Sequence, residues 1–278
     1  MLERVAHPSG VVFYRDKELA ALGVRHAFST RIGGSSTGPL ASLNLGNPSS
    51  VPPQTPFTPD PPERIAAHFS RLLSAAGLPG TRCAVRQVHG AAVAVVRRGE
   101  PFREGQEADA IVSDDPDRTV VIRTADCAAV LMASADGRLI GAVHAGWRGV
   151  VAGAVTAAAK VMAELGRPAV RAAVFPAISA DAFEVGAEVV EAFRSAGLPA
   201  WGVEGTDRGR ADVPGACRVQ LQRVGVMPQH CTVSGLCTYA RADEFYSHRR
   251  DGGVTGRMAL VAAAAESGRA VSTGEVGR

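Results

Sequence analysis

The chain has 278 residues, of which 46% are hydrophobic and 21% charged, as is typical of a globular protein with a sizeable core. The net charge is +3 and the arginines are spread along the chain without a basic run, which excludes a nucleic-acid groove. Five scattered cysteines without a CxxC pair, an N-terminus without an apolar stretch, and apolar runs too short to span a bilayer predict a reduced, cytoplasmic protein without a membrane partner.

The N-terminal part predicts two strands followed by a long loop. Residues 10–14 and 24–29 are strand-like, whereas residues 31–61 are rich in Gly, Ser, Pro and Asn. Loops of this length in compact domains are usually functional or disordered. We therefore expect the Pro-rich part, 48–62, to be a mobile loop, and the part from Arg31 to Asn44 to serve the function.

The remainder predicts strands and helices in mixed order. A helix is expected from Pro62 to about Ala76, with Gly77 as its C-cap. Strands are expected at residues 83–88, 91–97, 108–113, 119–125, 127–133 and 138–144. A helix from Val150 to about Leu165 is followed by a strand at 170–175, helices at 186–195 and 212–224, a strand at 231–235, a short acidic helix at 242–246, and a strand or helix at 258–264. Because strict βαβ alternation is absent, we expect an α/β fold in which layered mixed β-sheets are flanked by helices, as one domain over residues 1–278.

Three short segments place a residue that can bind a metal at the end of an apolar run. His89 lies in the segment 86–90, Cys127 ends the segment 124–127, and His144 lies in the segment 143–149. Two imidazoles and a thiolate would make a three-ligand site with an open fourth position, which is typical of a catalytic zinc. Their spacing matches no zinc finger or ribbon, so each can also be a turn or core residue, and only the fold can bring three strand ends together.

Asp126 is a candidate proton carrier or partner of an imidazole. A carboxylate inside an apolar stretch is usually paired or used, and Asp126 stands directly before Cys127. Neighbouring residues of a strand point to opposite faces. Asp126 and Cys127 can therefore serve one site only if the chain bends between them.

Three arginines are candidates to hold an anion. Arg148 stands between glycines just before the helix expected at Val150, whose N–H groups could also face an anion. Arg31 lies in the glycine-rich loop and Arg249 near the C-terminus. Each could hold a phosphate bidentately; a solvated surface charge is the alternative for each, and we favour that alternative for Arg148 and Arg249 but not for Arg31.

The segments that carry His89, Cys127 and His144 resemble the laccase-domain family. The resemblance includes residues 28–34, 42–46, 233–238 and 245–257 and extends over nearly the whole chain. Members of that family were long labelled multicopper polyphenol oxidases and are now read as purine nucleoside phosphorylases with adenosine deaminase activity; some bacterial members are called peptidoglycan editing factors. One departure is Ala177, which stands where the family usually has a cysteine. Another is the Pro-rich stretch after Gly46, and both changes concern the shape of the substrate pocket.

The resemblance implies a fold, a cofactor and substrates. The implied fold is a cysteine-hydrolase-like α/β fold, and the implied cofactor is zinc on His89, Cys127 and His144, with copper as a possible substitute in vitro. The implied partners are phosphate and purine nucleosides: adenosine, inosine, guanosine and methylthioadenosine. We expect a monomer whose catalytic residues include Asp126 and Arg31 beside the metal ligands. The expected substrate-binding residues are Arg31, Asn44, Arg148 and Arg249.

Three other functions remain open from the residues. In a metal-independent cysteine hydrolase or amidase acting in peptidoglycan quality control, Cys127 would be the nucleophile and His144 the base. In a copper-dependent polyphenol oxidase, two histidines and a cysteine could hold copper, but seven histidines in the whole chain are few for several copper ions. The third is a cell-wall binding protein without catalysis.

Overall fold

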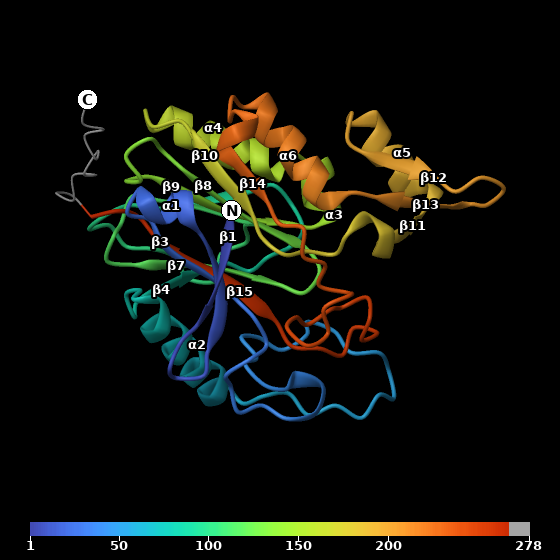
Figure 1. Ribbon diagram of the computed structural model, residues 1–278, viewed down its shortest axis with the longest axis horizontal. Helices are drawn as coiled ribbons and strands as arrows, with labels where there is room; N and C mark the ends of the chain where they lie inside the picture. The colour runs from blue at the N-terminus through green and yellow to red at the C-terminus, as the bar shows by residue number, and fades with distance from the viewer. Residues whose placement is uncertain (267–278) are drawn as a thin grey trace, which may run out of the picture.

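Two six-stranded mixed sheets lie face to face in the computed structural model, which describes residues 1–266 (Figure 1). The order of the first sheet is β1 (Leu2–Ala6), β2 (Val12–Asp16), β3 (Arg25–Ser29), β15 (Met258–Ala263), β7 (Thr119–Thr124) and β4 (Arg82–Ala84). The order of the second is β14 (Cys231–Val233), β10 (Arg171–Val174), β8 (Ala128–Ala133), β9 (Ile140–Ala145), β6 (Ala110–Ser113) and β5 (Val93–Val96). Both contain parallel and antiparallel pairs, so the expected layered α/β fold with mixed sheets is confirmed.

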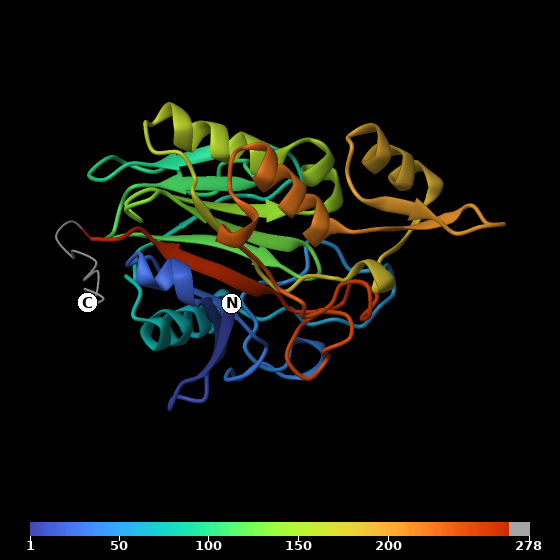
Figure 2. The ribbon, with the colours of Figure 1, turned by 45° about the horizontal axis from the view of Figure 1, so that its top comes forward.

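Helices cover the outer face of each sheet (Figure 2). On the second sheet α4 (Ala154–Glu164) packs against β6 and β9, and α6 (Val213–Arg223) against β8 and β10. On the first sheet α2 (Pro62–Ala76) packs against β3. The remaining helices are α1 (Lys17–Ala21), α3 (Trp147–Val151) and α5 (Ala187–Ser195), with short 3₁₀ turns at Gly38–Leu40, Ala180–Ala182 and Pro228–His230. No helix within residues 1–266 has the length and apolarity that a membrane crossing requires.

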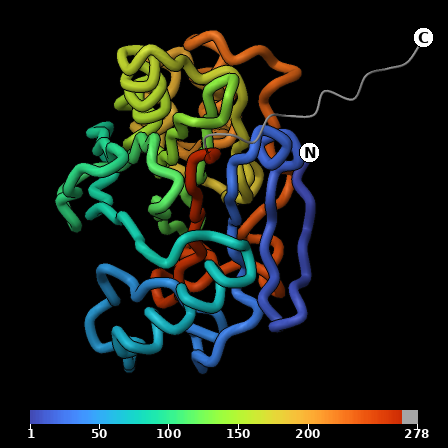
Figure 3. The backbone as a smooth tube through the Cα atoms, turned by 90° about the vertical axis from the view of Figure 1, so that its left-hand side faces the viewer, coloured from blue at the N-terminus to red at the C-terminus, as the bar shows by residue number. Residues whose placement is uncertain are grey.

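The last strand shows how the two layers are built. Met258, Leu260 and Ala262 of β15 pack between the two sheets, whereas Ala259 and Val261 face the core under α2. A strand that is covered on both faces needs apolar residues throughout. Its sequence therefore lacks the alternation of apolar and polar residues by which a strand is distinguished from a helix. The structure makes the ambiguous run at 258–264 a strand, which lies beside the N-terminal strands (Figure 3).

A third, small sheet stands beside the main sheets with α5 (Figure 1). Its strands are β11 (Glu184–Gly186), β13 (Arg208–Ala211) and β12 (Ala200–Gly202). The sequence predicted neither this sheet nor β1, because these strands are short and carry few β-branched residues.

Two predicted helices differ from the structure. The helix expected from Val150 to Leu165 is divided into α3 and α4, because Gly153 adopts a left-handed φ of 84°. The acidic helix expected at 242–246 is wrong, since that segment forms turns and Glu244 is held instead by side-chain bonds to Arg4 and Tyr14. The helix at Pro62–Ala76, with Gly77 as a left-handed C-cap, is as expected.

Candidate metal centre and substrate cavity

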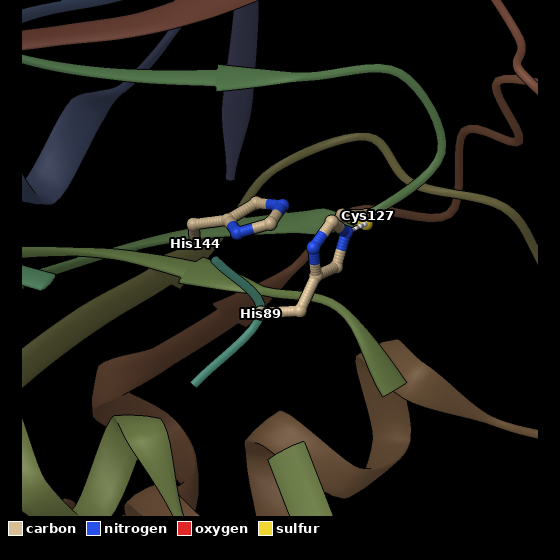
Figure 4. Close-up of side chains that lie close together, drawn as sticks. All are labelled: His89, Cys127 and His144. Atoms are coloured by element: carbon tan, nitrogen blue, oxygen red, sulfur yellow. Dashed lines mark hydrogen bonds between the residues drawn. The ribbon is translucent and has the colours of Figure 1, made fainter. Parts of the chain in front are cut away.

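His89, Cys127 and His144 lie together at one end of the two sheets (Figure 4). One ligand atom from each side chain can be chosen so that all three atoms lie within 4.8 Å of one another. Cys127 lies where the chain passes from β7 of the first sheet to β8 of the second, and His144 lies on β9, the neighbour of β8. His89 comes from the loop after β4, and its Nε2 lies 4.0 Å from the Cys127 Sγ. Side chains 38 and 17 residues apart in sequence thus converge because two sheets end at one place.

Left-handed backbone conformations at two non-glycine residues shape this end of the sheets. Asp126 has φ 83° and His89 has φ 60°. Such conformations cost energy in non-glycine residues and cluster at functional sites. At Asp126 this conformation bends the chain between Asp126 and Cys127, as expected if both residues belong to one site.

The carboxylate that orients an imidazole is Asp109, and the expectation that Asp126 does so is wrong. Asp109 Oδ1 accepts a hydrogen bond from His144 Nδ1 at 2.8 Å and one from the His89 backbone N–H at 2.9 Å. Its Oδ2 accepts from the N–H groups of Gly90 at 2.6 Å and Val88 at 3.2 Å. Because Nδ1 of His144 faces Asp109, Nε2 is left for a ligand.

Asp126 organises a different part of the site. Its carboxylate accepts from Thr238 Oγ1 at 2.6 Å, Ser247 Oγ at 3.0 Å and the Arg249 N–H at 2.7 Å. It therefore joins the turn that leads to Cys127 to the C-terminal loop that carries His248 and Arg249.

The charge of the cluster differs from that of free side chains. Burial alone would raise the pKa of the Cys127 thiol, but charge and hydrogen bonds from His144 and His89 outweigh burial and lower the pKa to about 6. Burial likewise disfavours the charged form of His144, but the charge of Cys127 and the hydrogen bond to Asp109 raise its pKa to about 9. Burial of Asp109 is outweighed by the bonds from His144 and Gly90, which lower its pKa. Without a metal, these opposite shifts favour a thiolate at Cys127 and an imidazolium at His144.

The cluster fits a metal ion in its donor set and in its space. Thiolate sulfur and imidazole nitrogen are the donors that zinc prefers, and three of them leave a fourth position open. Gly146 faces the cluster without a side chain: a Cβ there would lie 2.8 Å from His89 Cδ2 and 3.0 Å from Cys127 Sγ. That space therefore stays open beside the ligand atoms.

A cavity of about 850 Å³ opens onto the cluster, which is within the usual range for small-molecule sites. It is strongly cationic, since six arginines and three carboxylates line it: Arg86, Arg123, Arg148, Arg208, Arg249 and Arg257 with Asp126, Glu184 and Glu188. Apolar side chains form another part of its wall: Ile178, Phe183, Val185, Val189 and Val213. The cavity can thus receive a ligand with an anionic end and a flat apolar end.

Two of the predicted substrate-binding residues lie elsewhere. The Arg31 guanidinium donates to the carbonyls of Ala41 and Ala242 and covers the Tyr246 ring at 4.7 Å, so it fastens the loop to the C-terminal segment. Asn44 is fully buried; its amide donates to Asp60 and its oxygen accepts from the N–H groups of Gly46 and Arg257. Neither lines the cavity, which corrects both expectations.

The other two predicted arginines do line the cavity. Arg148 covers the Trp147 ring at 4.3 Å, and Arg249 covers the Phe183 ring at 5.0 Å while donating to the Glu184 carbonyl. Sequence reasoning missed Asp109, Arg123, Arg257 and His248. Asp109 carried the same signal as Asp126, a carboxylate within an apolar run, but it stands far in sequence from the cysteine.

Comparisons with known proteins find relatives in sequence and in fold. A purine nucleoside phosphorylase of Deinococcus radiodurans is 42% identical in sequence, over 85% of this chain and 88% of the relative. Purine nucleoside phosphorylase YfiH of Shigella flexneri is 38% identical, over 85% of this chain and 92% of the relative. The crystal structure of YlmD from Geobacillus stearothermophilus superimposes with a TM-score of 0.78 at 28% identity, covering 92% of this chain and 97% of YlmD.

The family model described as multi-copper polyphenol oxidoreductase laccase matches residues 25–265. That range contains the metal-ligand candidates and every residue of the cavity wall. The resemblance of the motifs is thereby confirmed, and this chain belongs to the multi-copper polyphenol oxidoreductase laccase family.

Proposed function

We propose that this protein is a zinc-dependent purine nucleoside phosphorylase, with His89, Cys127 and His144 as the metal ligands. The observation that carries the proposal is the meeting of a three-ligand cluster with a cationic cavity large enough for a nucleoside. The names of relatives at 38–42% identity support the same activity.

In phosphorolysis a phosphate oxygen forms a bond to C1′ of the ribose while the C1′–N9 bond breaks. The electron pair of that bond leaves with the purine, which takes up the proton lost by the hydrogen phosphate, and ribose 1-phosphate is the second product. Zinc held by His89, Cys127 and His144 would supply a Lewis acid.

The chain's own residues bind and position the reactants. The arginines of the cavity attract the anionic phosphate and offset its charge, while Phe183, Val185 and Val189 present an apolar wall to the purine. Asp109 fixes the ring orientation of His144 and the loop of His89. Asp126 holds the Arg249 loop over the cavity through the Arg249 N–H.

We also propose that the same cavity accepts adenosine, inosine, guanosine and methylthioadenosine, and that adenosine is deaminated there. In deamination water attacks C6 of the adenine, and the bond between C6 and the amino group breaks, so that adenosine and water give inosine and ammonia. Since both reactions use the same ligand cluster, they should be lost together. A single catalytic domain acting as a monomer in the cytoplasm completes the proposal.

The test is incubation of purified protein with inosine, with and without phosphate. We expect phosphate-dependent release of hypoxanthine and ribose 1-phosphate, and its loss in Cys127→Ser. The matched control is Cys237→Ser, since Cys237 is also partly exposed but bonds Ser179 and does not line the cavity. No phosphate-dependent base release from any of the four nucleosides would contradict the proposal.

A metal-independent cysteine hydrolase is a second candidate, because one observation favours it. In such an enzyme Cys127 would be the nucleophile, His144 the base and Asp109 the group that orients the base. The lowered pKa of the Cys127 thiol, about 6, suits this role. This candidate gives no role to His89. It predicts turnover that survives chelators and stops on alkylation of Cys127, whereas the phosphorylase loses activity to chelators and regains it with zinc.

A further inference from the structure

Two arginines of the cavity, Arg123 and Arg257, lie side by side next to the metal-ligand candidates. Arg123 lies on β7, where it pairs with Ala259 of β15, and Arg257 stands two residues before Ala259. Residues two apart in extended chain share a face of a sheet, so both arginines lie on the same face. The backbone at Gly46 packs on both, since a Cβ there would lie 3.2 Å from Arg123 Cδ and 3.4 Å from Arg257 Cγ.

Neither guanidinium forms an ion pair within the described part of the chain, in contrast to Arg86 of the same cavity, which pairs with Glu107. Arg257 is held by its own loop, since its Nη1 donates to the carbonyls of Thr255 at 2.9 Å and Gly256 at 3.0 Å. Burial lowers the pKa of both arginines, and the charge of Arg123 lowers that of Arg257 further. The charge of Glu104 acts on Arg123, and the charges of Cys127 and Asp126 act on Arg257, but none of these groups forms an ion pair with either arginine. Two adjacent, half-buried cations without an ion pair are costly, and an anionic ligand is the natural partner for them.

Arg257 lies within electrostatic reach of the ligand cluster. The charges of Cys127, Arg123 and Asp126 all act on Arg257, and both arginines line the cavity that opens onto the cluster. Arg148 and Arg249 are exposed and already cover the rings of Trp147 and Phe183. Arg123 and Arg257 are therefore the cavity arginines that form neither an ion pair nor a contact with an aromatic ring among the described residues, while Phe183 belongs to the apolar wall.

We propose that Arg123 and Arg257 form the subsite for inorganic phosphate. This inference rests on the proposed phosphorolysis and names the residues that hold its second substrate: the arginine pair binds the phosphate that attacks C1′. Two planar guanidinium groups can each bind two phosphate oxygens, which suits a tetrahedral dianion.

The test is steady-state phosphorolysis of inosine by Arg123→Gln and Arg257→Gln with phosphate varied. Loss of a bidentate, charge-assisted contact predicts a rise of about tenfold or more in the KM for phosphate. The KM for inosine should change less than about twofold, and the zinc content should stay that of the wild type. Arg82→Gln is the matched control. The charge of Arg82 acts on Arg123, but Arg82 covers the Phe69 ring and does not line the cavity.

Lysine variants and a nucleotide ligand distinguish a phosphate subsite from other roles of the two arginines. Arg123→Lys and Arg257→Lys keep the charge without the planar fork, so they stay informative if the glutamine variants fail to fold, and they should still raise the KM for phosphate several-fold. If the pair instead bound the 5′-phosphate of a nucleotide, the glutamine variants would weaken binding of inosine 5′-monophosphate and leave the KM for phosphate unchanged, which would overturn the inference. An unchanged KM for phosphate in all four variants of an active enzyme would overturn it as well. Absence of phosphorolysis in the wild type would instead contradict the proposed function.

Discussion

Replacement of Asp109 by Asn tests whether the hydrogen bonds around the ligand cluster prepare it for a metal. The variant removes one charge and turns one acceptor oxygen into a donor, although four donors face the carboxylate: His144 Nδ1 and the N–H groups of Val88, His89 and Gly90. An amide nitrogen that faced Nδ1 would favour the tautomer of His144 that is protonated on Nε2, which cannot bind a metal. An amide nitrogen on the other side would face the N–H groups of Gly90 and Val88 and release the loop of His89.

The magnitude follows from these bonds. Loss of an outer partner of a metal ligand typically costs 10–100-fold in metal affinity, or about 1.4–2.7 kcal/mol. Two of four bonds to a charged acceptor are lost, at roughly 1.5 kcal/mol each, so the free energy of unfolding should fall by about 3 kcal/mol. The zinc Kd is measured by competition with a chromophoric chelator, and stability by urea denaturation of the metal-free protein.

Asp114→Asn is the control, because Asp114 follows the same strand, β6, and binds the Arg98 N–H away from the cavity. We expect its zinc Kd to equal that of the wild type. If Asp109→Asn bound zinc as tightly as the wild type, the orienting role of Asp109 would be refuted.

Three further predictions concern the same site. In metal-free protein, the rate of Cys127 alkylation by iodoacetamide, followed by peptide mass spectrometry, should have its midpoint near pH 6 and rise to a plateau at higher pH, because the pKa of the thiol is lowered to about 6; a midpoint near 9 would contradict this. Gly146→Ala should weaken zinc binding about tenfold or more, since its Cβ displaces His89 and Cys127, whereas Gly80→Ala, in open space, should not; equal affinities would refute this. Asp126→Asn should lower the free energy of unfolding by about 2 kcal/mol without loss of zinc, and bound zinc lost in the folded variant would make Asp126 part of the metal site.

The fold was predictable where local chemistry decides the structure. A helix begins at Pro62 and ends at the Gly77 cap, as these two residue types predict. Runs rich in β-branched residues form strands of the two mixed sheets. The apolar run at 258–264 stayed ambiguous, because burial on both faces removes the alternation that separates strand from helix. The break at Gly153 was missed because the apolar pattern continues across it.

The candidate site was predictable in its ligand residues and less so in their surroundings. His89, Cys127 and His144 end apolar runs, which is visible in the sequence. The partner of His144 depends on the pairing of β6 with β9, which places Asp109 beside it, and nearness in sequence pointed wrongly to Asp126.

The arginines show the same limit. A glycine-rich loop suggested a phosphate contact for Arg31, but the loop folds so that this guanidinium meets two carbonyls. Arg123 and Arg257 reach the cavity only because β7 and β15 are paired. No pattern within either segment indicates that pairing.

The metal content of the purified protein tests the central claim most directly. Elemental analysis of the wild type, with Cys127→Ser and Cys237→Ser alongside, should find about one zinc per chain in the wild type and in Cys237→Ser, and almost none in Cys127→Ser. A metal-free wild type that still phosphorolyses inosine, or a Cys127→Ser protein that keeps its zinc, would contradict the account.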